Sequence, residues 1–372
     1  MTWNRRLMRT AFVFLVMMTM LADQSNAEIR AEWTQLTTAQ PMGRVNVLES
    51  DGHRLYAGTW NGVYISLDNG YTWGSSKVKH TCTAIAIHLN TVYAGTHGNG
   101  VVRSDNLGET WNPINDGLPL YEELDQYGRV EQILVTGSGT VITVTSLGTY
   151  TSTNRGETWH GVIDDWIVRQ DAWRAPDWPI ARSILSMTEF DGYLWGESDG
   201  DMFRSRDNGR TWESVSRFGH HPAHDWAVFN DRLYVAGGRG FARWNEEGLP
   251  FAWEYRIAGL PSDSDGYLDY APSLTSLAVN RGRLFAGLYD HGVYMFDARS
   301  DTWIPAGLQW LTVSALVSHQ SELYAATYAL HGRQAGTVHT PQGIYRASIS
   351  TVQPYGKAFA TWGAVKQEAP AK

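Results

Sequence analysis

The stretch GVYISLDNGYTW at residues 62–73 recurs three times along the chain. The copies are GVVRSDNLGETW at 100–111, GTYTSTNRGETW at 148–159 and DMFRSRDNGRTW at 201–212. Each copy is typical of a strand, a tight turn and the start of a second strand. Gly accepts the positive φ that a turn needs, and an Asp or Asn side chain can bond the backbone two residues on. The final Trp then begins the second strand as a large apolar anchor.

The shared core, Ser-x-Asp/Asn-x-Gly-x-Thr-Trp, is called a box below. We predict that its residues have a structural role, because a turn of this kind does not by itself indicate a chemical function. The box residues are Ser66, Asp68, Gly70, Trp73, Ser104, Asn106, Gly108, Trp111, Ser152, Asn154, Gly156, Trp159, Ser205, Asp207, Gly209 and Trp212.

A short β-rich run, such as LYAG at 55–58, precedes each box, and another apolar run precedes that one. Runs of the LYAG type begin at seven places: residues 55, 92, 141, 194, 233, 284 and 323. Four short strands per unit, repeated every ~40–50 residues, are typical of propeller blades. The sequence therefore predicts an all-β fold, a seven-bladed β-propeller of four-stranded antiparallel blades.

The boxes resemble the Asp-box, or BNR, repeats of sialidases, sortilin, xyloglucan-active glycosidases and the photosystem II assembly factor family. The four clear boxes carry this resemblance, and the repeat extends it over most of the chain. It implies a propeller of this superfamily. It implies no single function, because these relatives have unrelated functions on similar scaffolds.

Residues 1–27 are typical of a secretory signal peptide. They have a basic start, an apolar centre at 11–21 and small residues before a cleavage point at Ala27. The apolar run is short for a membrane span, so we expect no span in the mature chain. We predict an exported protein, periplasmic or extracellular, with the propeller at 28–350 and a C-terminal tail at 351–372.

The N-terminal strand near residues 32–37 resembles an isolated fourth strand of a blade. We predict that it pairs with residues 343–346 and closes the last blade, which would remove an exposed sheet edge. A second candidate, TWGAV at 361–365, also resembles a fourth strand. A long path through Pro354 separates it from the last blade, so the N-terminal strand is favoured.

Composition limits the class of partner. The net charge is −8, whereas a nucleic-acid binder usually shows a basic face, so no nucleic-acid partner is expected. A single cysteine, Cys82, excludes an internal disulfide. The cluster HHPAHD at 220–225 is the one metal-like motif, but no second cluster supports it, and we expect solvated histidines and no metal. We expect a monomer without a cofactor.

Strand parity separates two faces of the predicted ring. The boxes lie on one face, and the long connections lie on the other. Long loops on one face of a repeat scaffold usually form its binding surface. The long connections are 115–128, 161–181, 218–223, 258–272 and 328–342.

Candidate ligand-binding residues come from this loop face and from the mouth of the channel. Arginines at the starts of three innermost strands could converge on a carboxylate or phosphate, or could each pair with a loop aspartate such as Asp165 or Asp225. The loop tryptophans could stack on a ligand or form a lid over the ring. The candidates are Arg44, Trp60, His97, Arg129, Trp166, Arg182, Trp226, Arg239, Asp290, His291 and Tyr328.

Two classes of function remain open. A sialidase usually has six blades and an early Arg-Ile-Pro, whereas Arg44 is followed by Val45-Asn46. A glycosidase needs two facing carboxylates, and no spacing singles out a pair, so no catalytic residue is assigned. The sequence favours an exported, non-catalytic scaffold whose loop face holds a protein or glycan partner. The alternative is a sialidase- or xyloglucanase-like glycoside hydrolase that acts on extracellular glycans.

Overall fold

The computed structural model describes residues 28–36, 42–162, 184–198, 201–217, 223–238, 240–245, 253–261, 273–328 and 343–352. The chain divides into a large unit, Trp33–Ala347, and a small one that joins Met1–Glu32 with Ser348–Lys372. The large unit holds the sheets, and the small one holds the first residues of β1 and the last of β30. In the described ranges no helix has the length and apolar character needed to cross a bilayer.

The described residues form seven antiparallel four-stranded sheets, and in all but the last the strands follow chain order. In order from the innermost strand outward, blades 1 to 3 are β2 (Val45–Ser50), β3 (Leu55–Thr59), β4 (Gly62–Ser66), β5 (Gly74–Ser75); β6 (Cys82–His88), β7 (Thr91–Thr96), β8 (Val101–Ser104), β9 (Asn112–Pro113); and β12 (Val130–Val135), β13 (Val141–Thr145), β14 (Gly148–Ser152), β15 (His160–Gly161). Blades 4 and 5 are β16 (Ser186–Phe190), β17 (Tyr193–Ser198), β18 (Asp201–Ser205), β19 (Glu213–Arg217); and β20 (Ala223–Phe229), β21 (Arg232–Gly237), β22 (Gly240–Trp244), β23 (Trp253–Tyr255). Blades 6 and 7 are β24 (Leu274–Asn280), β25 (Arg283–Leu288), β26 (Gly292–Asp297), β27 (Thr302–Gly307); and β28 (Thr312–His319), β29 (Glu322–Tyr328), β30 (Gly343–Val352), β1 (Glu28–Leu36). A separate hairpin, β10 (Leu120–Tyr121) and β11 (Gln126–Tyr127), lies in the connection from blade 2 to blade 3.

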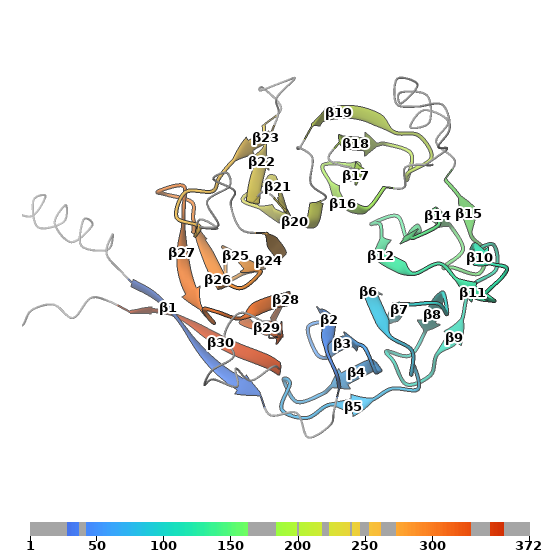
Figure 1. Ribbon diagram of the computed structural model, residues 1–372, viewed down its shortest axis with the longest axis horizontal. Helices are drawn as coiled ribbons and strands as arrows, with labels where there is room; N and C mark the ends of the chain where they lie inside the picture. The colour runs from blue at the N-terminus through green and yellow to red at the C-terminus, as the bar shows by residue number, and fades with distance from the viewer. Residues whose placement is uncertain are drawn as a thin grey trace, which may run out of the picture. The chain divides into compact units, whose positions relative to one another are not determined.

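The blades stand in a ring (Figure 1). Each innermost strand contacts the innermost strands of the blades on both sides, and the last of these contacts joins β28 to β2. The predicted seven-bladed β-propeller is therefore confirmed.

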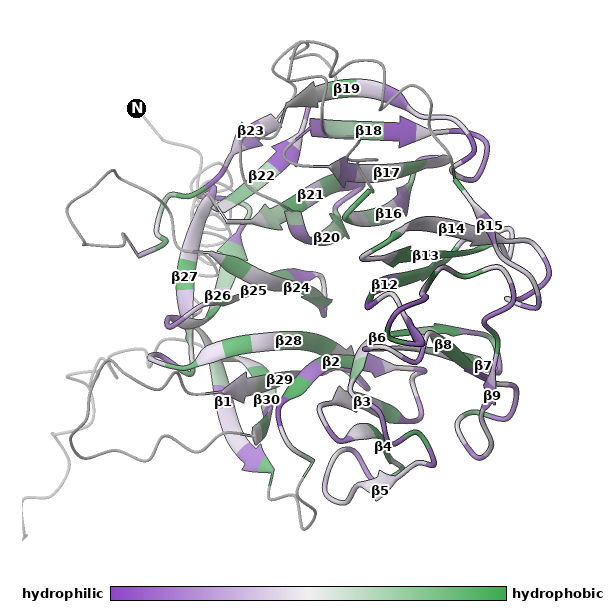
Figure 2. Ribbon diagram, turned by 45° about the vertical axis from the view of Figure 1, so that its right-hand side comes forward, coloured by the Kyte–Doolittle hydropathy of each residue, from purple (hydrophilic) through white to green (hydrophobic). Residues whose placement is uncertain are grey.

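The core lies between the blades. The second strand of each blade is almost wholly buried because each of its two faces packs against a neighbouring blade; β3 and β13 are buried at every residue. One apolar cluster joins Leu55 and Trp73 of blade 1 to Tyr324 and Ile344 of blade 7. Figure 2 shows the hydrophobic colour along strands such as β13 and hydrophilic residues at the turns.

The four box turns share one hydrogen-bond pattern. In the first, the Ser66 hydroxyl donates to an Asp68 carboxylate oxygen at 2.8 Å and accepts from the Gly70 N–H at 2.8 Å. The same carboxylate accepts from the Thr72 N–H at 2.8 Å. Thus the Asp side chain bonds the backbone four residues on, and not two as the sequence suggested. Gly70 has the expected positive φ, 83°.

The outermost strand of blade 7 comes from the other end of the chain, in the order β1-β30-β29-β28. The Trp33 indole N–H donates to the Ala306 carbonyl in blade 6 at 2.7 Å. The Trp303 indole of blade 6 makes the equivalent bond to the Arg256 carbonyl beside blade 5, also at 2.7 Å. Trp33 therefore occupies the position of a fourth-strand tryptophan. The alternative strand at 361–365 lies outside the described residues.

Side chains near the start of the innermost strands join neighbouring blades. Thr83 and Thr275 each donate a hydroxyl bond to a backbone carbonyl of the next blade, at 2.5 Å to Val130 and 2.5 Å to Val313. Ser314 does the same to Val45 at 2.7 Å and so joins the last blade to the first. The register shifts around these three residues, so a β-bulge directs each side chain outward from its own blade.

Thr275→Val is expected to lower the free energy of unfolding by about 1–3 kcal/mol, because the buried Val313 carbonyl loses its side-chain donor while the volume changes little. Urea unfolding measures the change. Thr188→Val, on the innermost strand of blade 4 and away from any bulge, is the matched control. Equal losses in the two variants would contradict a joining role for Thr275.

Candidate binding surface at the channel mouth

The antiparallel order places the two ends of every blade on opposite faces of the ring. The box turns lie at one end, the box face. The turns between second and third strands, and the connections into innermost strands, lie at the other, the loop face. Of the long connections predicted there, 115–128 is described in full; the other four lie wholly or partly outside the described residues.

Arg44 and Tyr328 meet across the joint of blades 7 and 1. Arg44 precedes β2, and Tyr328 ends β29. The guanidinium carbon lies 3.7 Å from the centre of the Tyr328 ring, which is a cation–π contact. The Arg44 Nε is buried and has no hydrogen-bond partner among the described residues. Burial raises the pKa of Tyr328, although the Arg44 charge opposes the shift.

Asp290 stands beside this pair in the turn between β25 and β26. Its N–H donates to the Thr312 hydroxyl at 3.1 Å, and that hydroxyl donates to its carboxylate at 2.8 Å. Thr312 begins β28, so the bonds connect blades 6 and 7. The Asp290 charge also acts on Tyr328, where it favours the protonated phenol and raises the pKa. The site therefore presents an arginine and a carboxylate on a rigid support.

Three exposed aromatic residues lie on the segments that carry this group or bond to it. Trp60 is 57% exposed, and its backbone N–H donates to the Arg44 backbone carbonyl at 3.0 Å. Tyr289 is 41% exposed. Trp310, two residues before Thr312, is 81% exposed in a turn with a positive φ of 70°. Large exposed aromatic rings are the usual anchors of binding surfaces. We call Arg44, Trp60, Asp290, Trp310 and Tyr328 the mouth site.

Sequence reasoning found four of these five residues and missed Trp310. Its segment, GLQWLT at 307–312, is a short connection between blades 6 and 7 and was not among the long ones. The available signal was a tryptophan outside both the box and the strand pattern, a position that it shares with Trp60.

Four of the remaining candidate residues are described: His97, Arg129, Trp226 and His291. Arg129, just before β12, pairs with Glu131 at 3.1 Å, and this exposed pair contributes little to stability. Trp226 is buried between blades 4 and 5, where its indole donates to Ser186 at 3.0 Å. His97 is exposed and His291 is partly buried. Trp166, Arg182 and Arg239 lie outside the described residues.

The metal-like cluster is only partly described. His224 contacts the Leu274 carbonyl through Nδ1 at 2.7 Å and so joins blade 5 to blade 6. His220 and His221 lie outside the described residues. Among the residues that the structure describes, no group of three His, Cys, Asp or Glu side chains is placed to hold a metal ion.

Two carboxyl groups on innermost strands have altered acidity. Burial, and then the Asp225 charge, raise the pKa of Glu49 to about 8. Burial also raises the pKa of Asp225 to about 6, although its oxygens accept N–H bonds from Leu277 at 2.7 Å and Trp226 at 2.8 Å. Asp225 thus joins blade 5 to blade 6. Sequence reasoning did not single out Glu49.

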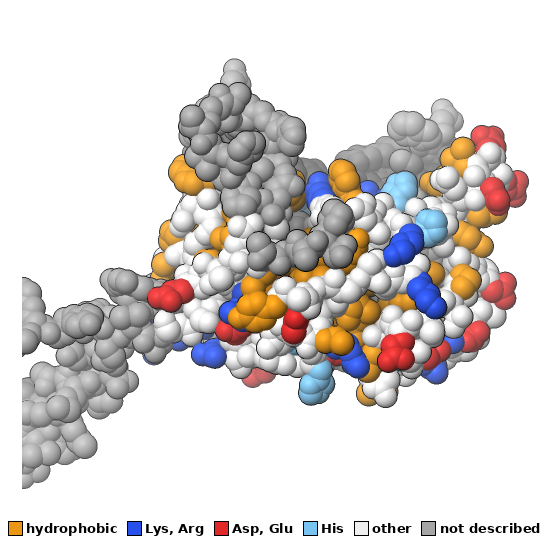
Figure 3. Space-filling view, turned by 90° about the horizontal axis from the view of Figure 1, so that it is seen from below, with side chains coloured by type: hydrophobic (Ala, Val, Ile, Leu, Met, Phe, Trp, Pro, Cys, Tyr) orange, Lys and Arg blue, Asp and Glu red, His pale blue; other side chains and the backbone are white. Residues whose placement is uncertain are grey.

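The side of the ring that Figure 3 presents carries Lys and Arg side chains interspersed with Asp and Glu. No large basic area appears on that side. The β10–β11 hairpin adds exposed Glu122, Glu123 and Asp125 to the loop face. Charges of both signs on this side agree with the modest net charge of −8.

The fold and this surface define a seven-bladed β-propeller with a candidate binding site at one mouth of its channel. No protein-family model and no curated protein matches the sequence. Among solved structures, YCF48 from Cyanidioschyzon merolae is similar, with 12% identity, a TM-score of 0.60 and coverage of 85% of this chain and 98% of that one. YCF48 bound to D1 peptide is similar with 12% identity, a TM-score of 0.57 and coverage of 87% and 96%. The GH74 xyloglucanase from Xanthomonas campestris follows with 15% identity, a TM-score of 0.55 and coverage of 82% and 55%. At these identities the likeness shows the fold alone.

Proposed function

We propose that this protein is a non-catalytic Asp-box propeller that binds a segment of a partner protein at the mouth site. One observation carries the proposal: the Arg44 guanidinium group is fixed on an aromatic ring at a blade joint, its Nε is buried and has no hydrogen-bond partner among the described residues, and the exposed Trp60 is bonded to the Arg44 backbone. A fixed arginine is suited to bind a carboxylate, to which it can donate two N–H···O hydrogen bonds.

The aromatic side chains supply the rest of the affinity. Binding energy in protein interfaces concentrates in a few Trp, Tyr and Arg residues, and the mouth site presents all three types. Preorganisation also favours binding, because the Tyr328 ring already restricts the Arg44 side chain. A propeller of the same fold has been solved with a peptide bound, which supports a peptide-binding use of the scaffold.

Arg44→Ala is expected to weaken binding of a selected acidic peptide at least tenfold, through loss of the carboxylate contact and the stacked cation. The peptide would come from a random library displayed with free carboxyl termini, and fluorescence anisotropy would measure its affinity. Trp310→Ala is expected to weaken it several-fold. Leu67→Ala is the matched control, since Leu67 is 74% exposed on the box face, and it should leave affinity unchanged.

Two outcomes would count against the proposal. One is a library that yields no peptide above background. The other is a peptide whose affinity does not respond to Arg44→Ala or Trp310→Ala. Turnover of xyloglucan or a sialoside by the purified protein would favour the glycoside hydrolase alternative, for which the raised pKa values of Glu49 and Asp225 would provide proton donors.

We also propose that the protein is exported as a monomer after cleavage at Ala27, and that the segment after β30, 353–372, is a tail outside the blades. The sequence placed the start of this tail at 351, but β30 runs to Val352. The described part of β1 begins at Glu28, so this cleavage would leave the strand intact. The mass of the mature protein from its native source tests the cleavage, and retention of Met1–Ala27 would refute it. Sedimentation of the purified protein tests the monomer.

A further inference from the structure

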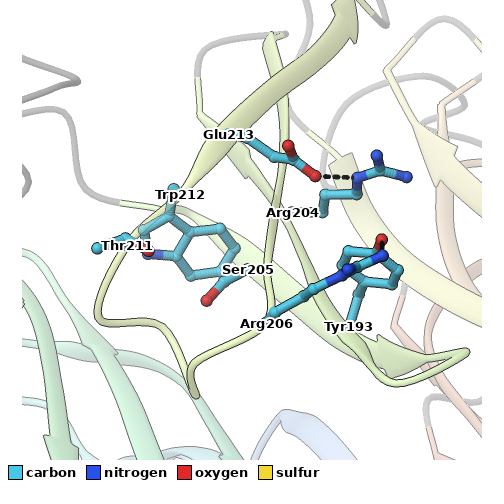
Figure 4. Close-up of a pocket in the computed structure, with 7 residues that line it drawn as sticks. All are labelled: Tyr193, Arg204, Ser205, Arg206, Thr211, Trp212 and Glu213. Atoms are coloured by element: carbon cyan, nitrogen blue, oxygen red, sulfur yellow. Dashed lines mark hydrogen bonds and ion pairs between the residues drawn. The ribbon is translucent and has the colours of Figure 1, made fainter.

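A hollow of about 350 Å³ lies on the outer part of blade 4, away from the mouth site. The box turn between β18 and β19 forms it, together with the start of β17 (Figure 4). Its volume is at the lower end of the range for ligand pockets, roughly 300–1,000 Å³. Arg204, Arg206, Tyr193 and Glu213 line one part of it, and Thr211 and Trp212 another.

Two guanidinium groups share one tyrosine ring in this hollow. The Arg204 and Arg206 guanidinium carbons lie 4.5 Å and 4.4 Å from the centre of the Tyr193 ring. Arg206 also donates to the Tyr193 hydroxyl, and Arg204 donates to Glu213. The Glu213 carboxylate therefore offsets one of the two positive charges, and the hollow keeps a net positive charge from its three ionic side chains.

The arginine at position 204 repeats in other blades, always with an acid. Arg103 pairs with Glu157 at 2.8 Å, Arg243 with Glu254 at 2.5 Å, and Arg346 with Glu322 at 3.4 Å. Arg204 with Glu213 follows the same rule. An arginine on the third strand, neutralised by a nearby acid, is thus a feature of the scaffold.

Arg206 does not belong to this set of third-strand arginines, because it lies in the turn after β18. It occupies the second position of its box, where the other boxes have Leu67, Asp105 and Thr153. The turn does not need an arginine there, because its bonds come from Ser205 and Asp207 as in the other boxes. Asp207, next in the chain, is engaged with Thr211 through both carboxylate oxygens, at 2.8 and 2.7 Å.

We propose that this hollow is an anion site that takes a sulfate or phosphate group, with Arg206 as its main ligand and Arg204 as the second cation. The spacing of the guanidinium N–H groups matches the spacing of two oxygens of a sulfate or phosphate, so the arginine can donate two hydrogen bonds to it. The Tyr193 ring and hydroxyl hold Arg206 in place before the anion arrives, which reduces the ordering cost of binding. An anion would also relieve the repulsion between two cations on one ring.

Isothermal titration with inorganic phosphate and with inorganic sulfate tests the site, at an ionic strength held constant with sodium chloride. The wild-type protein is expected to bind one ion with saturation, and Arg206→Ala to bind at least tenfold more weakly. Tyr193→Phe keeps the ring but removes the hydroxyl that holds Arg206, so a smaller, several-fold loss is expected. Arg299→Ala removes an exposed arginine of blade 6 and should change nothing.

A sulfated monosaccharide and its unsulfated parent distinguish a free ion from an ester. Tighter binding of the ester than of inorganic sulfate identifies an ester ligand, and equal binding identifies the free ion; both support the site. The proposal is overturned if wild-type protein shows no saturable binding of any of these anions. It is also overturned if Arg206→Ala, with an unchanged circular dichroism spectrum and melting temperature, binds them as the wild type does.

Discussion

Deletion of residues 28–43, which removes strand β1, is expected to lower the free energy of unfolding by on the order of 5 kcal/mol or more. Leu36 and Met42 are both 4% exposed in the cluster that joins blade 7 to blade 1, and burial of each such side chain contributes roughly 1.5–3 kcal/mol. The Trp33 indole bond to the Ala306 carbonyl is lost as well. A whole domain has only about 5–15 kcal/mol of net stability, so the shortened protein is expected to be largely unfolded.

Exposure of β30 adds a second consequence. Without β1, the outer edge of blade 7 presents unpaired N–H and C=O groups, and such edges pair with other chains. We therefore expect aggregation on concentration, measured by light scattering, besides the loss of a cooperative thermal transition measured by circular dichroism.

The matched control deletes residues 353–372 and leaves every described strand intact. It is expected to keep the melting temperature within a few degrees of that of the chain 28–372. The reverse result, a stable protein without 28–43 and an unstable one without 353–372, would show that the C-terminal segment closes the ring.

Repeated local features made the fold predictable from the sequence. A box fixes a turn through bonds among residues no more than four positions apart, so its signal survives in the sequence of each copy. The order of blades follows from counting these units. Even here the inferred bond was wrong in detail, because the Asp side chain reaches the Thr72 N–H and not the residue two positions on.

Two side-chain contacts between residues far apart in the sequence were not predictable, although the pairing of the N-terminal strand with the last blade was. Arg44 and Tyr328 meet only because the ring closes, and no pattern in either segment indicates the other. Asp225 and Glu49 are coupled across blades 5 and 1 for the same reason. Arg206 was visible in the sequence as an unusual residue within a box. Its possible role became apparent only when the structure placed Arg204 and Tyr193 beside it.

Glu49→Gln is expected to remove most of the loss of stability that the protein undergoes between about pH 5 and pH 8. Burial and the Asp225 charge raise the pKa of the folded Glu49 from its ordinary 4.5 to about 8. Between these values the unfolded chain has released the proton and the folded chain still holds it. The stabilising contribution is therefore complete below pH 4.5 and is lost as the pH rises through 8.

The size of this effect follows from the width of the window. Between pH 4.5 and pH 8, each pH unit lowers the free energy of unfolding by up to about 1.4 kcal/mol. The whole shift of the Glu49 pKa therefore lowers it by at most about 5 kcal/mol. The Glu49 side chain is only partly buried by its surface area, and its partial exposure to solvent reduces the cost of charging it. Roughly 2 kcal/mol is therefore the expected gain in stability of Glu49→Gln at pH 9. Urea unfolding at pH 5, 7 and 9 measures it.

Two further variants separate the raised pKa of Glu49 from a general effect of removing charge. Glu131→Gln removes an acid that pairs with Arg129 on another innermost strand, and it should leave the slope of stability against pH unchanged. Asp225→Asn removes the second cause of the Glu49 shift, so the Glu49 pKa should fall and the slope should flatten. The same change weakens the acceptor of the Leu277 and Trp226 N–H groups, so the protein should lose stability at pH 5. A wild-type stability that does not fall between pH 5 and pH 8 would refute the argument, because a carboxyl group that stays protonated to pH 8 in the fold must make folding less favourable as the solution becomes more alkaline.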